Sequence, residues 1–157
     1  MLLRVYILLI AILCVSCNPT PKHEIIENHP NGSPKIRKTY TDNVNDSTTY
    51  LFEELYDNGT VKIKGEIVNE ERNGAWNAYY ENGKLWSYGI YSNGLREGRS
   101  IVYNNDGTIK LSGYYKDNRV DSLWVTFKPN GDTAQVTKYK DGEIVTSFYN
   151  DNLPRTK

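Results

Sequence analysis

The chain has 157 residues, of which 38% are hydrophobic and 24% charged, and its 19 basic residues are balanced by 19 acidic ones. The length suits one domain, and the balanced charge argues against a surface that binds nucleic acid. There are 13 Tyr and 12 Gly, eight of the glycines following Asn or Asp, but only 2 Cys and 2 His. This composition favours strands and turns and leaves little material for the commonest catalytic and metal sites.

The first 16 residues have the pattern of a secretory signal. A short, positively charged start ending at Arg4 precedes an apolar run over residues 5–15. Those 11 residues would form a helix of only about 16 Å, whereas the hydrocarbon core of a bilayer is about 30 Å thick. The segment is therefore predicted to be a cleaved signal and not an anchoring helix.

The signal ends in Leu13-Cys14-Val15-Ser16-Cys17, which resembles the lipobox of bacterial lipoproteins. In that family a small residue precedes a Cys that is diacylated, freed by cleavage and often acylated again. The resemblance implies a lipid on Cys17 and attachment to the bacterial cell envelope, at the outer membrane if the bacterium is Gram-negative. The family prefers Leu where this chain has Cys14. The alternative is that both cysteines are discarded with an ordinary signal peptide.

Both cysteines lie at this boundary and none occurs in residues 18–157, so a disulfide framework is excluded. Cleavage before Cys17 removes Arg4 and no acidic residue, which leaves a net charge of −1. A nearly neutral chain is not held electrostatically by anionic lipid or nucleic acid. Membrane attachment is therefore expected to rest on the lipid at Cys17.

Turn signals recur every 24 residues along the rest of the chain. The first series is Asn58-Gly59, Asn82-Gly83, Asp106-Gly107 and Asn130-Gly131. A second series holds Gly65, Gly89 and Gly113 with Thr137 in the fourth place, and a third holds Gly74 and Gly98 with Ser122 next. Repetition at this period indicates supersecondary units that complete their cores against their neighbours.

Within each copy, two runs rich in Tyr, Trp, Ile and Val flank the Asn-Gly or Asp-Gly pair. This pattern predicts a β-hairpin closed by a type I′ turn, in which both central residues have positive φ. The fold class is therefore all-β, an elongated antiparallel meander of repeated β-hairpins. The core is predicted in four apolar columns: Leu55, Tyr79, Tyr103 and Phe127; Val61, Leu85, Ile109 and Thr133; Ile67, Tyr91, Tyr115 and Tyr139; and Phe52, Trp76, Trp124 and Phe148, interrupted by Ser100. The odd spacing of Trp76 and Tyr79 indicates a bulge, or a strand covered on both faces.

The predicted organisation begins with a signal at 1–16 and a lipidated Cys with a short tether at 17–24. The repeat array then covers 25–150 and is followed by a tail at 151–157. Within the array, a degenerate cap at about 25–47 carries the turn Asn31-Gly32 and a polar insertion over residues 41–47. Four full copies follow at about 49–72, 73–96, 97–120 and 121–144.

The motifs Tyr79-Tyr80-Glu81-Asn82-Gly83-Lys84-Leu85, Gly89-Ile90-Tyr91 and Gly74-Ala75-Trp76 resemble the MORN repeat variant of bacterial proteins. That family has an aromatic pair, Asn-Gly, a Lys-rich strand, Gly-x-Tyr, and Gly-x-Trp opening the next copy. Ser122-Leu123-Trp124 lacks the glycine and Gly98-Arg99-Ser100 lacks the Trp. The resemblance covers residues 48–147, and 24–41 more weakly. It implies a hairpin array with an interaction role, and some members are labelled antitoxins of toxin–antitoxin systems.

The sequence offers no constellation for catalysis. No His follows His29, so the array cannot supply the His of a Ser-His-Asp site. His23 and His29 are expected to be solvated and not to bind metal. The adjacent pairs Glu53-Glu54 and Glu70-Glu71 would point to opposite faces of a strand. The chain is therefore expected to be no enzyme and to need no metal or cofactor.

One group of aromatic residues departs from the repeat and is the candidate binding patch. Trp86, Tyr88 and Ile90 share a strand face by period-2 alternation, and Tyr114 takes the place of Ile90 in the next copy. Exposed apolar clusters commonly mark interaction sites. The alternative is that the array folds over and buries these side chains.

The sequence thus predicts a membrane-anchored envelope lipoprotein whose array is a non-catalytic protein-binding or scaffolding module, with a protein partner of unknown identity. One alternative is an antitoxin- or immunity-like protein that neutralises a toxic partner in the envelope. A less favoured alternative is a glycan-acting enzyme that uses carboxylates alone, which would need two of them about 5–10 Å apart in a cleft.

Overall fold

The computed structural model describes residues 21–40 and 48–149. Its strands are β1 (Lys22–Asn28), β2 (Pro34–Tyr40), β3 (Thr49–Leu55), β4 (Val61–Val68), β5 (Glu71–Tyr79), β6 (Leu85–Ser92), β7 (Leu95–Tyr103), β8 (Ile109–Lys116), β9 (Arg119–Phe127), β10 (Thr133–Lys140) and β11 (Glu143–Tyr149). The predicted signal segment, Cys17, the predicted insertion over residues 41–47 and the predicted C-terminal tail lie outside the described residues. Within the described part, no helix is long and apolar enough to cross a bilayer.

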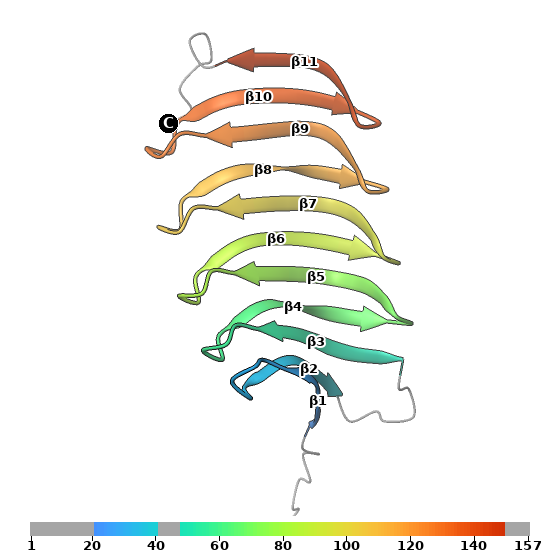
Figure 1. Ribbon diagram of the computed structural model, residues 1–157. Coiled ribbons are helices and arrows are strands. Elements are labelled where there is room, and N and C mark those ends of the chain that lie inside the picture. The colour runs from blue at the N-terminus through green and yellow to red at the C-terminus, as the bar shows by residue number, and fades with distance from the viewer. Residues whose placement is uncertain (1–20, 41–47, 150–157) are drawn as a thin grey trace, which may run out of the picture.

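The 11 strands form one antiparallel sheet in strict chain order, and Figure 1 shows them rising from β1 in blue to β11 in red. The predicted all-β meander is confirmed. Because neighbouring strands lie about 4.8 Å apart, the array is about 48 Å long from its first strand to its last. Each strand pairs only with the strands next to it in sequence, so each repeat depends on its immediate neighbours.

A single open sheet limits how far the predicted core columns can be buried. Most of the column residues are half-buried, and no large side chain of the described residues is fully enclosed. The buried hydrophobic residues are Tyr50, Leu55, Ile67, Trp76, Ala78, Ile101 and Trp124. Tyr50, Ile67 and Trp76 form a buried hydrophobic cluster, with Phe52 and Tyr91 packed against it.

The turns at the two ends of the strands differ in type. At the Asn-Gly and Asp-Gly series only the glycine has positive φ, as at Gly59 (φ 82°). The Gly59 amide donates to the Tyr56 carbonyl and the Tyr56 amide to the Thr60 carbonyl, which is a type I turn with a glycine bulge. The predicted type I′ geometry is therefore wrong at these positions. Type I′ turns occur at the other ends of the strands, where both central residues have positive φ: Asn69-Glu70, Asn93-Gly94, Asp117-Asn118 and Asp141-Gly142.

The sheet begins earlier than predicted, because Lys22 to Glu24, assigned to the tether, lie in β1. These residues pair with β2, with Lys22 opposite Tyr40 and His23 opposite Thr39. The His23 Nδ1 and Thr39 Oγ1 atoms are 2.9 Å apart. Pairing with β2 thus brings residues of the predicted tether into the first hairpin.

Phe148 does not continue the Trp column, because the register of the last hairpin is shifted by one residue. Val136 faces Phe148, whereas its counterpart Ser112 faces Val125. Gly74, Gly98 and Ser122 adopt positive φ in the bulge of their copies, but Thr146 is β-branched and does not. Thr137 also replaces the glycine on which the aromatic ring would lie. Phe148 is consequently 55% exposed.

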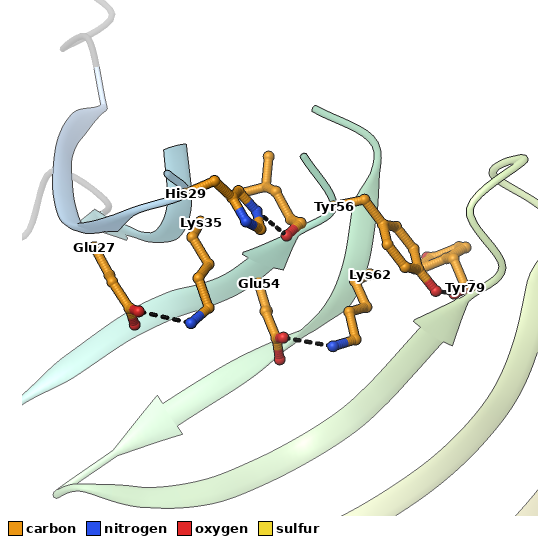
Figure 2. A network of polar contacts seen from close by, with 8 residues as sticks. Glu27, His29, Lys35, Glu54, Tyr56, Lys62 and Tyr79 are labelled. Atoms are coloured by element: carbon orange, nitrogen blue, oxygen red, sulfur yellow. Dashed lines mark hydrogen bonds and ion pairs between the residues drawn. The ribbon is translucent and has the colours of Figure 1, made fainter. Parts of the chain in front are cut away.

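At the strand ends that carry the glycine-bulge turns, side chains connect one repeat to the next (Figure 2). The Tyr56 hydroxyl donates to the Tyr79 carbonyl at 2.9 Å. One repeat later, the Tyr80 hydroxyl donates to the Tyr103 carbonyl at 2.8 Å. His29 occupies the same place in the cap hairpin, and its Nε2 lies 3.0 Å from the Leu55 carbonyl. The expectation that His29 is solvated is therefore wrong: it is half-buried and bonded. We call these three hydrogen bonds the inter-repeat latches.

Removing one latch is expected to lower the free energy of unfolding by about 1 kcal/mol, the usual net contribution of such a hydrogen bond. Tyr80→Phe deletes only the hydroxyl that donates to the Tyr103 carbonyl. Tyr103→Phe is the matched control, because the Tyr103 hydroxyl bonds no described residue while its carbonyl remains in place. Urea unfolding followed by circular dichroism measures both variants. Equal stability of the two would contradict an energetic role for the latch.

Candidate functional site

One face of the sheet, here called the Trp face, carries Trp76 on β5 and Trp124 on β9. Each indole lies flat on a glycine of the preceding strand, Trp76 on Gly65 and Trp124 on Gly113. The indole Nε1 groups donate to main-chain carbonyls, at 3.1 Å from Trp76 to Glu66 and at 3.0 Å from Trp124 to Tyr114. Two copies thus have the same arrangement, here called the seat, in which a glycine lies below the indole ring and a main-chain carbonyl beside it accepts the indole N–H.

The middle copy keeps this seat but lacks the ring. Gly89 lies opposite both Trp76 and Ser100, and Ser100 lies opposite Gly113, so all four share the Trp face. A methyl group added at Gly89 would meet its nearest neighbours, Tyr91 Cε2 and Ser100 Oγ, only at 3.9 and 4.0 Å. The result is a hollow of about 290 Å³ between the two indoles, both of which line it.

Two arginines and two tyrosines border the hollow toward the strand ends that carry the type I′ turns. The Arg72 guanidinium lies 4.2 Å from the centre of the Trp76 ring and donates to the Tyr91 hydroxyl at 3.3 Å. Arg96 lies over the Tyr115 ring and donates to the hydroxyls of Tyr91 and Tyr115, each at 3.1 Å. All five residues line the hollow. These contacts fix both guanidinium groups at its rim.

The arginines also alter the acidity of Tyr91. Partial burial acts to raise the pKa of its hydroxyl, but the hydrogen bonds from Arg96 and Arg72 and their positive charges outweigh that effect. The pKa of Tyr91 therefore lies below its usual value. The rim of the hollow is a positive environment that stabilises negative charge.

Trp86 is placed by a bulge that sequence alternation does not reveal. Tyr79 faces Leu85 and Ala78 faces Ser87, so Trp86 is the extra, unpaired residue. Its ring is 47% exposed, lies 6.4 Å from the Tyr80 ring between centroids, and lines the hollow. Its counterpart one repeat earlier, Lys62, pairs with Glu54 at 2.7 Å (Figure 2). Trp86 is thus part of the site on the Trp face.

Tyr88 and Ile90, two other members of the predicted patch, also line the hollow, whereas Tyr114 does not. Tyr88 is opposite Asn77 and Ile101, and Ile90 is opposite Ala75. These pairs alternate along the strands with the pairs of the Trp face, so they belong to the opposite face of the sheet. Tyr114 is 49% exposed and faces Arg99 on that same opposite side. The side chains of Tyr88 and Ile90 are half-buried. Three of the four predicted residues, Trp86, Tyr88 and Ile90, thus border one hollow.

The residues that line the hollow can bind but offer little for acid–base chemistry. The lining includes three Trp side chains, Tyr, Ile, Val, Leu and Arg, but no Asp, Glu or His. A pair of carboxylates for glycoside hydrolysis is therefore not present there. Across residues 21–40 and 48–149, no three His, Cys, Asp or Glu side chains are grouped to hold a metal ion.

The sequence carries one signal for this site. Ser100 leaves a gap in the predicted Trp column. The retention of Gly89 beneath that gap is the informative feature, because a glycine with no ring above it has no steric reason to stay small.

Comparison with known proteins bears on one hairpin of the array. No curated protein matches the chain. The family model described as MORN repeat variant matches residues 72–93, which span most of β5 and β6 and include Trp76 and Gly89, both of which line the hollow. The hairpin that contributes Trp76, Trp86 and Gly89 to the hollow is thus similar to a MORN repeat variant.

Proposed function

We propose that the protein is a membrane-anchored lipoprotein of the bacterial cell envelope, whose array is a non-catalytic module that binds or scaffolds a partner protein. The lipobox-like sequence before Cys17 supports the anchor. The MORN repeat variant at residues 72–93 and the open hairpin sheet support the repeat module.

The observation that carries the binding role is the hollow on the Trp face. It is bordered by Trp, Tyr and Arg side chains, the residue types that most often dominate the energy of protein interfaces. The sheet places them on a rigid, hydrogen-bonded scaffold whose strands are fixed on both sides. Such preorganisation lowers the entropic cost of binding.

The anchor is tested by Cys17→Ala in cells fed labelled palmitate. Wild type is expected to incorporate label and to sediment with membranes, because two or three acyl chains at about 0.8 kcal/mol per buried methylene hold a protein stably. Cys17→Ala should lose both properties. Cys14→Leu, which restores the residue that lipoproteins prefer, is the matched control and should keep them. Equal labelling of wild type and Cys17→Ala would contradict the anchor.

The binding role is tested by photo-crosslinking in cells. A photoreactive phenylalanine analogue replaces Ser87, which lines the hollow, or Leu123, which is 53% exposed and lies next to Trp124 on the opposite face. A discrete protein adduct is expected from position 87 and not from 123. A toxic envelope protein in that adduct would assign neutralisation as the role. No adduct from either position would contradict a protein-binding module.

A further inference from the structure

We propose that the hollow is a docking seat for an aromatic side chain, best an indole, which a partner protein presents beside a carboxylate. The inference rests on the proposed binding role and names the chemistry of the partner at that site. It begins from three equivalent glycines, two of which carry a ring of this chain while the third does not.

The occupied seats define the shape of the missing group. At Gly65 and Gly113 there is no room for even a methyl group beneath the indole, so ring and backbone are in full contact. Gly89 offers the same bare backbone, and Ser100 leaves the space above it open. The carbonyls that accept the indole N–H belong to Glu66 and Tyr114. The equivalent residue in the middle copy is Ile90, which lines the hollow.

The size and character of the hollow fit a ring. Its volume of about 290 Å³ exceeds the roughly 150 Å³ in which a buried apolar cavity holds benzene. Trp76 and Trp124 stand on either side, Ala78, Val102 and Leu111 are further along the Trp face, and Trp86 is exposed at the margin. Offset or edge contacts between such rings contribute about 0.5–1.5 kcal/mol beyond the burial of their area.

The charge at the rim specifies the group beside the ring. Arg72 and Arg96 donate to tyrosine hydroxyls, but within the described part of the chain neither lies within 4.0 Å of a carboxylate. A guanidinium has five N–H donors, so each retains donors for a further acceptor. A partner carboxylate would gain charge-assisted hydrogen bonds there. A protein segment with Asp or Glu near a Trp therefore fits better than a neutral glycan.

The test uses saturation-transfer-difference NMR on the full chain as isolated, in lipid nanodiscs if it is membrane-bound, with empty nanodiscs as the blank. The probes are N-acetyltryptophan, its neutral amide, N-acetylleucine and chitotriose. Saturable transfer to the indole protons of N-acetyltryptophan is expected, with a Kd on the order of 1 mM. The amide should bind about 3- to 10-fold more weakly, and N-acetylleucine should give no saturable signal.

Two variants locate the binding. Ser100→Trp supplies the missing ring from the chain itself, so it should remain folded and bind N-acetyltryptophan at least about 10-fold more weakly. Tyr114→Ala changes an exposed aromatic residue on the opposite face and should bind as wild type does. Equal binding of leucine and tryptophan derivatives, unchanged binding by Ser100→Trp, or tighter binding of chitotriose would overturn the proposal. A crosslinked partner that persists in Ser100→Trp would overturn it too while leaving the binding role intact.

Discussion

Replacing Gly113 by Ala is expected to lower the free energy of unfolding by about 3 kcal/mol. The added methyl group would fall inside the ring of Trp124, whose indole lies directly on Gly113. Trp124 is buried and its Nε1 is held by the Tyr114 carbonyl, so the ring cannot move without losing that bond. Overpacking of this kind costs typically 1–3 kcal/mol, and more where the neighbour is fixed. Gly65→Ala should act in the same way beneath Trp76.

Gly89→Ala is the matched control, because it makes the same change at the seat that has no ring. The new methyl group would make only ordinary contacts with Tyr91 and Ser100. Since Ala is preferred over Gly in strands by roughly 0.5–1 kcal/mol, the stability of this variant should be unchanged or slightly raised. Urea titrations of the three variants give the comparison. A loss at Gly89 as large as that at Gly113 would refute the description of the seats.

Truncating Trp76 is expected to cost about 3–5 kcal/mol, as for other buried Trp-to-Ala changes. Trp76 is 5% exposed and belongs to the buried hydrophobic cluster with Tyr50 and Ile67. Its ring centroid lies 5.8 Å from that of Phe52 and 6.0 Å from that of Tyr91, and Arg72 covers it. Trp76→Ala therefore removes contacts with strands on both sides as well as the hydrogen bond to Glu66.

Trp86→Ala removes the same number of atoms from a side chain that is 47% exposed, and it should cost less than about 1 kcal/mol. The difference in unfolding free energy between the two variants distinguishes Trp76, which supports the sheet, from Trp86, which lies at the margin of the hollow. It is measured by thermal and urea unfolding monitored by far-ultraviolet circular dichroism. If Trp86→Ala proved as destabilising as Trp76→Ala, the margin of the hollow would be part of the core.

The repeat and the antiparallel order of the strands could be predicted from the sequence, because period and composition report directly on which side chains recur. The placement of Trp86 and Phe148 could not. Both placements depend on bulges, because one unpaired residue moves the side chains of the residues beyond it to the other face of the sheet. The turn type could not be predicted either, because Asn-Gly is compatible both with a type I′ turn and with a type I turn followed by a glycine bulge. The role of His29 was missed because its counterparts in the latches are tyrosines.

The single-file order of the strands has a mechanical consequence. Hydrogen bonds in an antiparallel sheet run perpendicular to the strands, so in this array they point along its length, from β1 toward β11 (Figure 1). A load applied between the two ends would therefore peel one ladder at a time instead of shearing many together. Each strand released adds several residues of extended chain, so the array would lengthen in steps and limit the tension passed between its ends.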